Sequence, residues 1–142
     1  MNPKIYLMFV MLTGLPRVSG LLGFIGAKQS AGAQGNLTCG GLPAKNITVT
    51  LYDGDLMWDS KMDEAQTSND GTFELHGSKR EVTKIEPYLE ISHHCRVKEG
   101  CAKTVKMEIP LPFVFKGSDI DVHYPVNIDL AKHNLPSTLE CH

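Results

Sequence analysis

The chain has 142 residues, of which 42% are hydrophobic and 21% charged, and its formal net charge is -2. This length allows one domain with a short appendage, and an apolar content typical of globular proteins excludes a wholly disordered or collagen-like chain. The nearly balanced charge gives no reason to expect nucleic acid as the main partner.

Residues 1–20 have the three-part layout of a secretory signal peptide. Lys4 gives a positive start, residues 5–12 form an unbroken apolar run, and residues 18–20 offer small side chains for cleavage. The run is shorter than the roughly 20 apolar residues that span a bilayer, so we expect export and no transmembrane span. Cleavage would remove Lys4 and Arg17 but no acid, which leaves a mildly acidic secreted chain.

The remaining chain alternates between apolar and polar residues in short segments. Residues 21–32 are rich in glycine and small residues, and we interpret them as a flexible lead-in. Alternation with a period of two predicts half-buried strands at residues 47–52, 104–109 and 125–130, and shorter patterns predict strands at residues 73–75 and 85–91. No helical period of any length interrupts them. The pattern predicts an all-β domain over residues 33–142, an antiparallel sandwich of seven or eight strands.

Four cysteines, Cys39, Cys95, Cys101 and Cys141, point to two disulfides in an exported chain. Three connectivities are open, and sequence alone does not choose among them. Cys95 and Cys101 are close enough to bridge the two sides of one turn, which would leave Cys39 to pair with Cys141. Zinc is disfavoured because the paired C-x2-C spacing of zinc sites is absent, and we expect no metal.

Two tripeptides fit the N-glycosylation pattern, Asn36-Leu37-Thr38 and Asn46-Ile47-Thr48. Alternation places Asn46 on the polar face of the strand that also holds Thr48 and Thr50. We expect a glycan on at least one of the two asparagines.

Residues 53–64 are predicted to form a solvated acidic loop that holds the single tryptophan of the chain. Their acidic residues do not make a calcium loop of the EF-hand type, because Met57 and Trp58 stand where an oxygen ligand and a glycine are required. Met57 and Trp58 are the candidate contact residues for a partner if they are exposed. The alternative is that Trp58 folds back and caps the sandwich.

The sequence contains no recognisable catalytic motif. His93 and His94 precede Cys95, but adjacent strand residues point to opposite faces, so we interpret them as surface histidines beside a disulfide. No G-x-S-x-G nucleophile motif and no glycine-rich phosphate loop occur. We therefore expect no catalytic residue, no cofactor and no enzymatic activity.

Several motifs together resemble those of the transthyretin-like family, secreted proteins found chiefly in nematodes. The resemblance covers residues 22–142. Its motifs are the turn at Cys39-Gly40-Gly41, the turn at Asn69-Asp70-Gly71, the run His93-His94-Cys95, and the terminal Glu140-Cys141-His142. It implies a β-sandwich of the transthyretin type in an extracellular protein whose biochemistry is mostly undefined.

Fold alone does not give function, because this sandwich occurs in hormone carriers, in 5-hydroxyisourate hydrolase and in adhesive modules. The resemblance to the hydrolase fails at the C-terminus, where this chain has Leu139-Glu140-Cys141-His142 instead of Tyr-Arg-Gly-Ser. Our leading hypothesis is a secreted, non-enzymatic binding module for an extracellular protein or lipid. The alternative is a carrier of a small hydrophobic ligand, and the third hypothesis is a related hydrolase.

Overall fold

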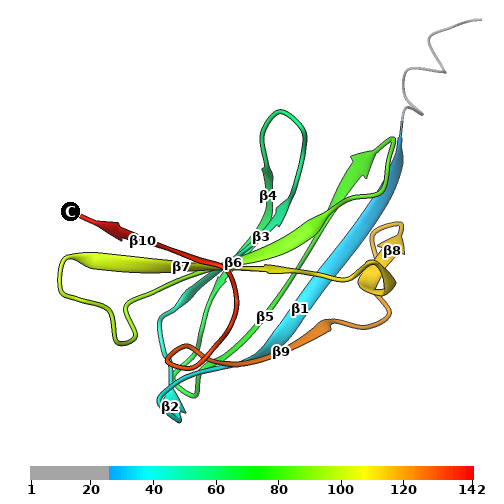
Figure 1. The fold of residues 1–142 in the computed structure, drawn as a ribbon. Coiled ribbons are helices and arrows are strands. Elements are labelled where there is room, and N and C mark those ends of the chain that lie inside the picture. Colours follow the sequence, from blue (N-terminus) through cyan, green and yellow to red (C-terminus); the bar gives the residue numbers. More distant parts are fainter. Residues whose placement is uncertain (1–25) are drawn as a thin grey trace, which may run out of the picture.

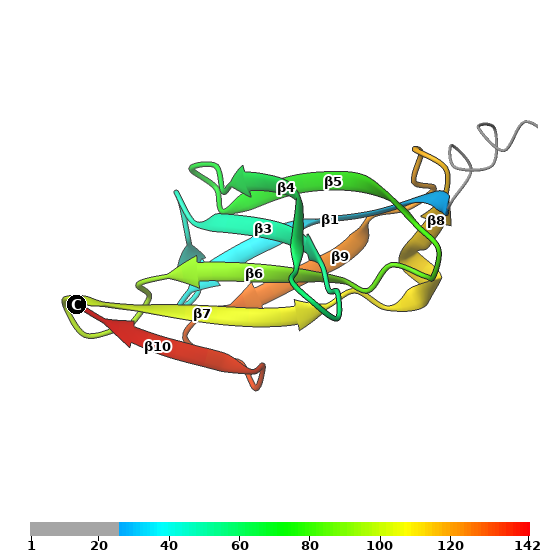
Figure 2. The same ribbon diagram turned by 90° about the horizontal axis from the view of Figure 1, so that it is seen from above.

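The computed structural model describes residues 26–142, which form two five-stranded β-sheets (Figure 1). The first sheet contains β1 (Ala27–Cys39), β2 (Leu42–Pro43), β5 (Thr72–Glu81), β8 (Val114–Lys116) and β9 (Tyr124–Asp129). The second has the order β10 (Ser137–Cys141), β7 (Cys101–Glu108), β6 (Pro87–His93), β3 (Thr48–Asp53) and β4 (Ser60–Gln66). Figure 2 shows β10 beside β7, at the edge away from β4. The predicted all-β sandwich is confirmed, but residues 26–142 form ten strands instead of seven or eight. One pair, β1 and β9, is parallel.

The strands predicted from alternation lie where one face is buried. β3, β6, β7 and β9 overlap the predicted segments to within two residues at each missed end, and β5 extends the one predicted at residues 73–75. Val49 and Leu51 of β3 are fully buried between the sheets, as predicted. Thr50, predicted to be wet, is also buried, because β3 is flanked by β4 and β6 and its hydroxyl donates to Glu64 at 3.4 Å.

The flexible lead-in predicted over residues 21–32 is wrong for residues 27–32, which form the first half of β1. This half pairs with β5, and Ser30 and Ala31 are fully buried. The small residues serve close packing, since a Cβ on Gly32 would lie 2.6 Å from the Ile120 side chain. The proposed signal peptide at residues 1–20 and the rest of the lead-in, residues 21–25, lie outside the described residues.

The acidic loop predicted over residues 53–64 is also shorter than expected. β4 occupies Ser60–Gln66 and pairs with β3, so the connecting loop comprises residues 54–59. The prediction failed because β4 is an edge strand, where charged side chains are tolerated and hydrophobic alternation is weak.

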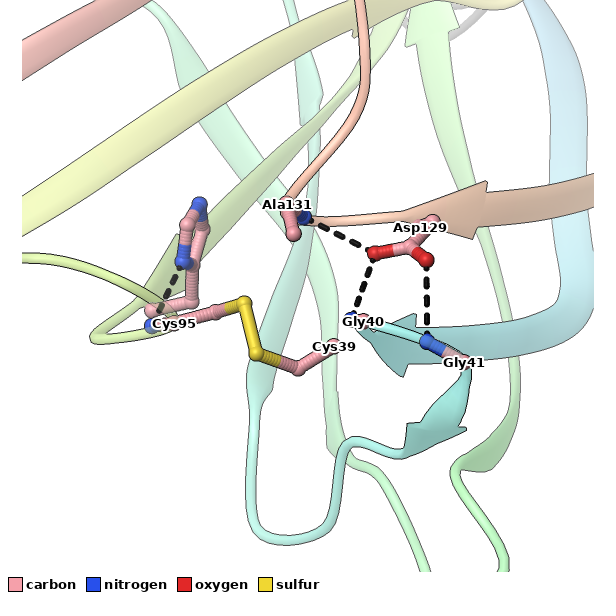
Figure 3. Close-up of a disulfide and its surroundings, with 7 residues drawn as sticks. Cys39, Gly40, Gly41, Cys95, Asp129 and Ala131 are labelled. Atoms are coloured by element: carbon pink, nitrogen blue, oxygen red, sulfur yellow. Dashed lines mark hydrogen bonds between the residues drawn. A yellow bond between two sulfur atoms is a disulfide. The ribbon is translucent and has the colours of Figure 1, made fainter.

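The core lies between the sheets and joins residues from both. Its fully buried members include Ala33, Leu37, Val49, Leu51, Leu89, Ile91 and Val105. The turn that opens β2 uses glycines with positive φ, +60° at Gly40 and +85° at Gly41, as a tight hairpin requires. Both amides donate to the carboxylate of Asp129, at 2.9 and 3.0 Å, which fastens this turn to the end of β9 (Figure 3).

All four cysteines form disulfides, as predicted, but the pairing that joined Cys95 to Cys101 is wrong. Cys39 pairs with Cys95 (Figure 3), and Cys101 pairs with Cys141. The first bond links the end of β1 to the turn that follows β6. The second links β7 to β10, whose register places Cys141 opposite Cys101. The loops span 56 and 40 residues, for which the chain-entropy model gives about 4 kcal/mol per bond.

Candidate binding surface at the β3–β4 loop

The loop of residues 54–59 projects beyond the sheets at the top of Figure 1, where it joins β3 to β4. Short hydrogen-bonded links fix its shape: Asp55 Oδ1 accepts the amide of Leu56 at 2.7 Å, and Asp59 Oδ1 accepts the amide of Asp55 at 3.2 Å. The hydroxyl of Tyr88 donates to the other carboxylate oxygen of Asp59. The base of the loop is therefore tied to β6.

The tip of this loop carries three apolar side chains in solvent. Leu56 is fully exposed, Met57 is 78% exposed and Trp58 is 70% exposed, and we call these three residues the apolar tip. The alternative in which Trp58 folds back onto the sandwich is wrong, because the core is filled from both sheets and the loop carries its tip outward. Clustered exposed apolar side chains that include a tryptophan are typical of binding surfaces.

Tyr88 anchors the loop from the outer face of the second sheet. Its ring stacks on Tyr52 with centroids 5.4 Å apart, and the Lys106 ammonium lies 4.0 Å from its centroid. Burial and the neighbouring Asp59 raise the pKa of the Tyr88 phenol, while the hydrogen bond from Tyr88 holds the pKa of Asp59 below its usual value. Tyr88 thus stays protonated and Asp59 ionised at neutral pH, which preserves the anchor.

An open hollow of about 1130 Å³ lies beside the loop, and we call it the acidic hollow. Its lining residues include six carboxylates, namely Asp53, Asp55, Asp59, Glu81, Glu86 and Glu108. The lining also includes Lys84 and Lys106, together with the exposed leucines Leu56 and Leu111. The arrangement combines a negative interior with apolar neighbours.

Lys79 of β5 compensates three of these carboxylates, those of Asp53, Asp55 and Glu81. Its Nζ lies 3.0 Å from Asp53 Oδ2, 3.9 Å from Asp55 Oδ2 and 2.6 Å from Glu81 Oε1. It also lies 3.1 Å from the hydroxyl oxygen of Ser60. The hydrogen bond to Glu81 is the largest cause of a raised pKa at Lys79. Asp53 is 2% exposed and also accepts the amide of Glu86 at 2.8 Å, so this network ties β5 to β3 below the loop.

The two adjacent histidines have different environments. His93 is 1% exposed, its Nδ1 accepts the amide of Cys95 at 3.0 Å, and its buried Nε2 has no hydrogen-bond partner. His94 is exposed, with Nδ1 2.8 Å from the carbonyl oxygen of Cys101. The prediction of a surface position is therefore wrong for His93, because it continues the inward-facing series of Leu89 and Ile91. Burial lowers its pKa to about 4.

The two glycosylation candidates also differ in position. Asn36 lies in β1 between β5 and β9, and its Oδ1 is buried without a hydrogen-bond partner. Asn46 is exposed in the loop before β3, with a φ of 59°, and not on the polar face of the strand, which begins at Thr48.

Residues 26–142 contain neither a helix that could span a membrane nor a cluster of metal ligands. No helix in this part of the chain is long and apolar enough to cross a membrane. Within the same residues, no three His, Cys, Asp or Glu side chains come together in a way that could hold a metal ion.

Sequence reasoning found the apolar tip but missed the residues that support it. The pattern at residues 85–91, with Leu89 and Ile91 inward, places Tyr88 on the outer face, so its ring could have been located. Its hydrogen bond to Asp59 and the contacts of Lys79 with Asp53 join residues far apart in the chain, so no local sequence pattern predicts them.

Two five-stranded sheets with two disulfides, and an anchored apolar loop at one end, define a disulfide-bonded β-sandwich of the transthyretin type. The model of the Transthyretin-like family matches residues 34–110. The chain is 35% identical to Transthyretin-like protein 2 of Caenorhabditis elegans over 131 residues, which cover 84% of this chain and 87% of that protein. It is 36% identical to Transthyretin-like protein 5 of the same organism, over 78% of this chain and 82% of the relative. This chain belongs to the transthyretin-like family.

Proposed function

We propose that this chain is a secreted, non-enzymatic binding module that contacts an extracellular partner through the apolar tip. The observation that carries the proposal is the exposure of Leu56, Met57 and Trp58 on a loop whose base is held by Asp59 and Tyr88. A loop already held in place loses less conformational entropy on binding, which favours affinity. Exposed aromatic side chains are frequent energetic centres of interfaces.

Two further features support an extracellular setting. Both disulfides suit an oxidising compartment, and the first 20 residues have the layout of a signal peptide. The acidic hollow favours a binding module over a carrier of a small hydrophobic ligand, because such carriers enclose an apolar cavity whereas this hollow is open and lined by carboxylates.

The test compares the wild-type protein with Trp58→Ala, and uses Leu42→Ala as the matched control. Leu42 is 72% exposed in β2, at the end of the sandwich opposite the loop (Figure 1). Each protein is immobilised and exposed to extracellular fluid and cell-surface extracts, and the retained proteins and lipids are quantified by mass spectrometry. We expect a set of ligands that wild type and Leu42→Ala retain and Trp58→Ala loses.

The opposite result would be one ligand set common to all three proteins, which would show that the apolar tip makes no contact. Thermal unfolding of each variant checks that the fold persists. Because Trp58 is largely exposed, its substitution should change the free energy of unfolding by less than about 0.5 kcal/mol.

A further inference from the structure

The apolar tip and the acidic hollow lie side by side, because the β3–β4 loop forms part of the wall of the hollow. Asp55, Leu56 and Asp59 belong to the loop and also line the hollow. Other lining residues come from the segment between β5 and β6 and from the end of β7, which contributes Glu108. A partner that covers Trp58 therefore also approaches these carboxylates.

The negative charge of the acidic hollow is only partly compensated within the protein. Lys79 pairs with three of the six carboxylates, those of Asp53, Asp55 and Glu81. Within residues 26–142, no Lys, Arg or His nitrogen lies within 4.0 Å of the carboxylate of Glu86 or of Glu108. Lys84 and Lys106 also line the hollow, but they leave a clear excess of negative charge next to the apolar tip.

We propose that the apolar tip docks onto a protein segment that carries lysine or arginine side chains beside apolar ones. This inference rests on the proposed function, because it names the chemistry of the partner that covers the tip. The partner's cations would complement the uncompensated carboxylates, and its apolar side chains would cover Leu56 and Trp58. The same negative excess repels an anionic bilayer, so the charges favour a basic protein segment over such a membrane.

The test uses the full-length exported protein with its disulfides intact and two labelled peptides of equal length. One peptide alternates lysine with leucine, and the other alternates glutamate with leucine. Binding is followed by fluorescence anisotropy at low and high salt. We expect the lysine peptide to bind at least about tenfold more tightly than the glutamate peptide, with an affinity that falls as salt is added.

Charge-reversed variants locate the interaction on the protein. Glu86→Lys combined with Glu108→Lys reverses the charge in the acidic hollow. Glu99→Lys combined with Glu140→Lys changes the net charge equally at exposed positions outside the lining of the hollow. We expect the hollow variant to lose about tenfold in affinity for the lysine peptide, and the control variant to lose less than about twofold. Equal losses in the two variants would overturn the inference.

Two other outcomes would also overturn it. One is equal affinity for both peptides, including the case in which neither binds. The other is binding to phosphatidylcholine vesicles that contain phosphatidylserine without binding to the lysine peptide. If Trp58→Ala loses its captured ligands but charge reversal leaves the peptide affinity unchanged, the inference fails while the proposed function stands.

Discussion

The buried imidazole of His93 should make the folded chain less stable as the pH falls. Replacing His93 by asparagine should remove this pH dependence. The folded chain disfavours protonation of His93 because Nδ1 accepts the Cys95 amide and Nε2 is buried without a partner. Burial is the largest cause of the lowered pKa, and smaller contributions come from three positive neighbours. The ring of His133 lies 6.5 Å away, Lys103 lies opposite His93 in the register of β6 and β7, and His94 is adjacent in sequence. Asparagine keeps an acceptor for the amide and does not titrate.

The size of the effect follows from the two pKa values of His93. Its pKa is about 4 in the folded chain against 6.5 for an unperturbed histidine, so the unfolded chain binds the proton more readily. The associated stability is complete above the unfolded pKa and is lost as the pH falls from 6.5 towards 4. Linkage gives a loss of about 2 kcal/mol between about pH 7 and pH 5. Asp59 and Asp129 have lowered pKa values, so their contributions are lost only near and below 3.8.

Urea unfolding at about pH 7 and pH 5, with the disulfides intact, measures this difference. We expect the free energy of unfolding to fall from pH 7 to pH 5 by about 2 kcal/mol more in the wild-type protein and in His94→Asn than in His93→Asn. The comparison uses the change with pH within each protein, so any constant cost of the substitution cancels. If His93→Asn and the wild-type protein lose the same amount, the buried imidazole does not control the acid sensitivity and the reasoning is refuted.

Three further predictions concern other parts of the molecule. Tyr88→Phe removes the donor to Asp59, so amides of the β3–β4 loop should exchange faster with deuterium, while the free energy of unfolding falls by only about 1–2 kcal/mol. Unchanged exchange would show that this hydrogen bond does not hold the loop. Leu89→Ala empties a fully buried site and should cost about 2–5 kcal/mol in urea unfolding, whereas a cost below about 1 kcal/mol would contradict the packed core. Protein secreted from eukaryotic cells should lose its glycan mass in Asn46→Gln and keep it in Asn36→Gln, because the Asn36 amide oxygen is buried; the reverse pattern would contradict this.

The sequence predicts strands best where a single face of the strand is buried. β7 and β9 show this alternation clearly, because each has polar side chains on its other face. The first half of β1 escaped prediction since its buried residues are Gln, Ser, Ala and Gly, which carry no hydrophobic period. β4 escaped because an edge strand tolerates charges.

The exposed residues of the candidate site could be predicted from the sequence, but the contacts that hold the loop in place could not. Met57 and Trp58 are conspicuous as apolar residues among acidic ones, which a sequence shows directly. The anchor joins Tyr88 to Asp59 across 29 positions, and such a pair is defined only by the packing of β6 under the loop. Disulfide pairing was out of reach for a similar reason, since it depends on β10 joining the second sheet beside β7.

Site-specific photo-crosslinking tests the central claim, that the apolar tip is the contact surface, most directly. A photoreactive phenylalanine derivative replaces Trp58 in one protein and Leu42, at the other end of the sandwich, in a second, and both are irradiated in extracellular fluid. We predict covalent adducts with a defined partner from position 58 and none with that partner from position 42. Adducts formed equally from both positions, or from position 42 alone, would contradict the assignment of the apolar tip as the binding surface.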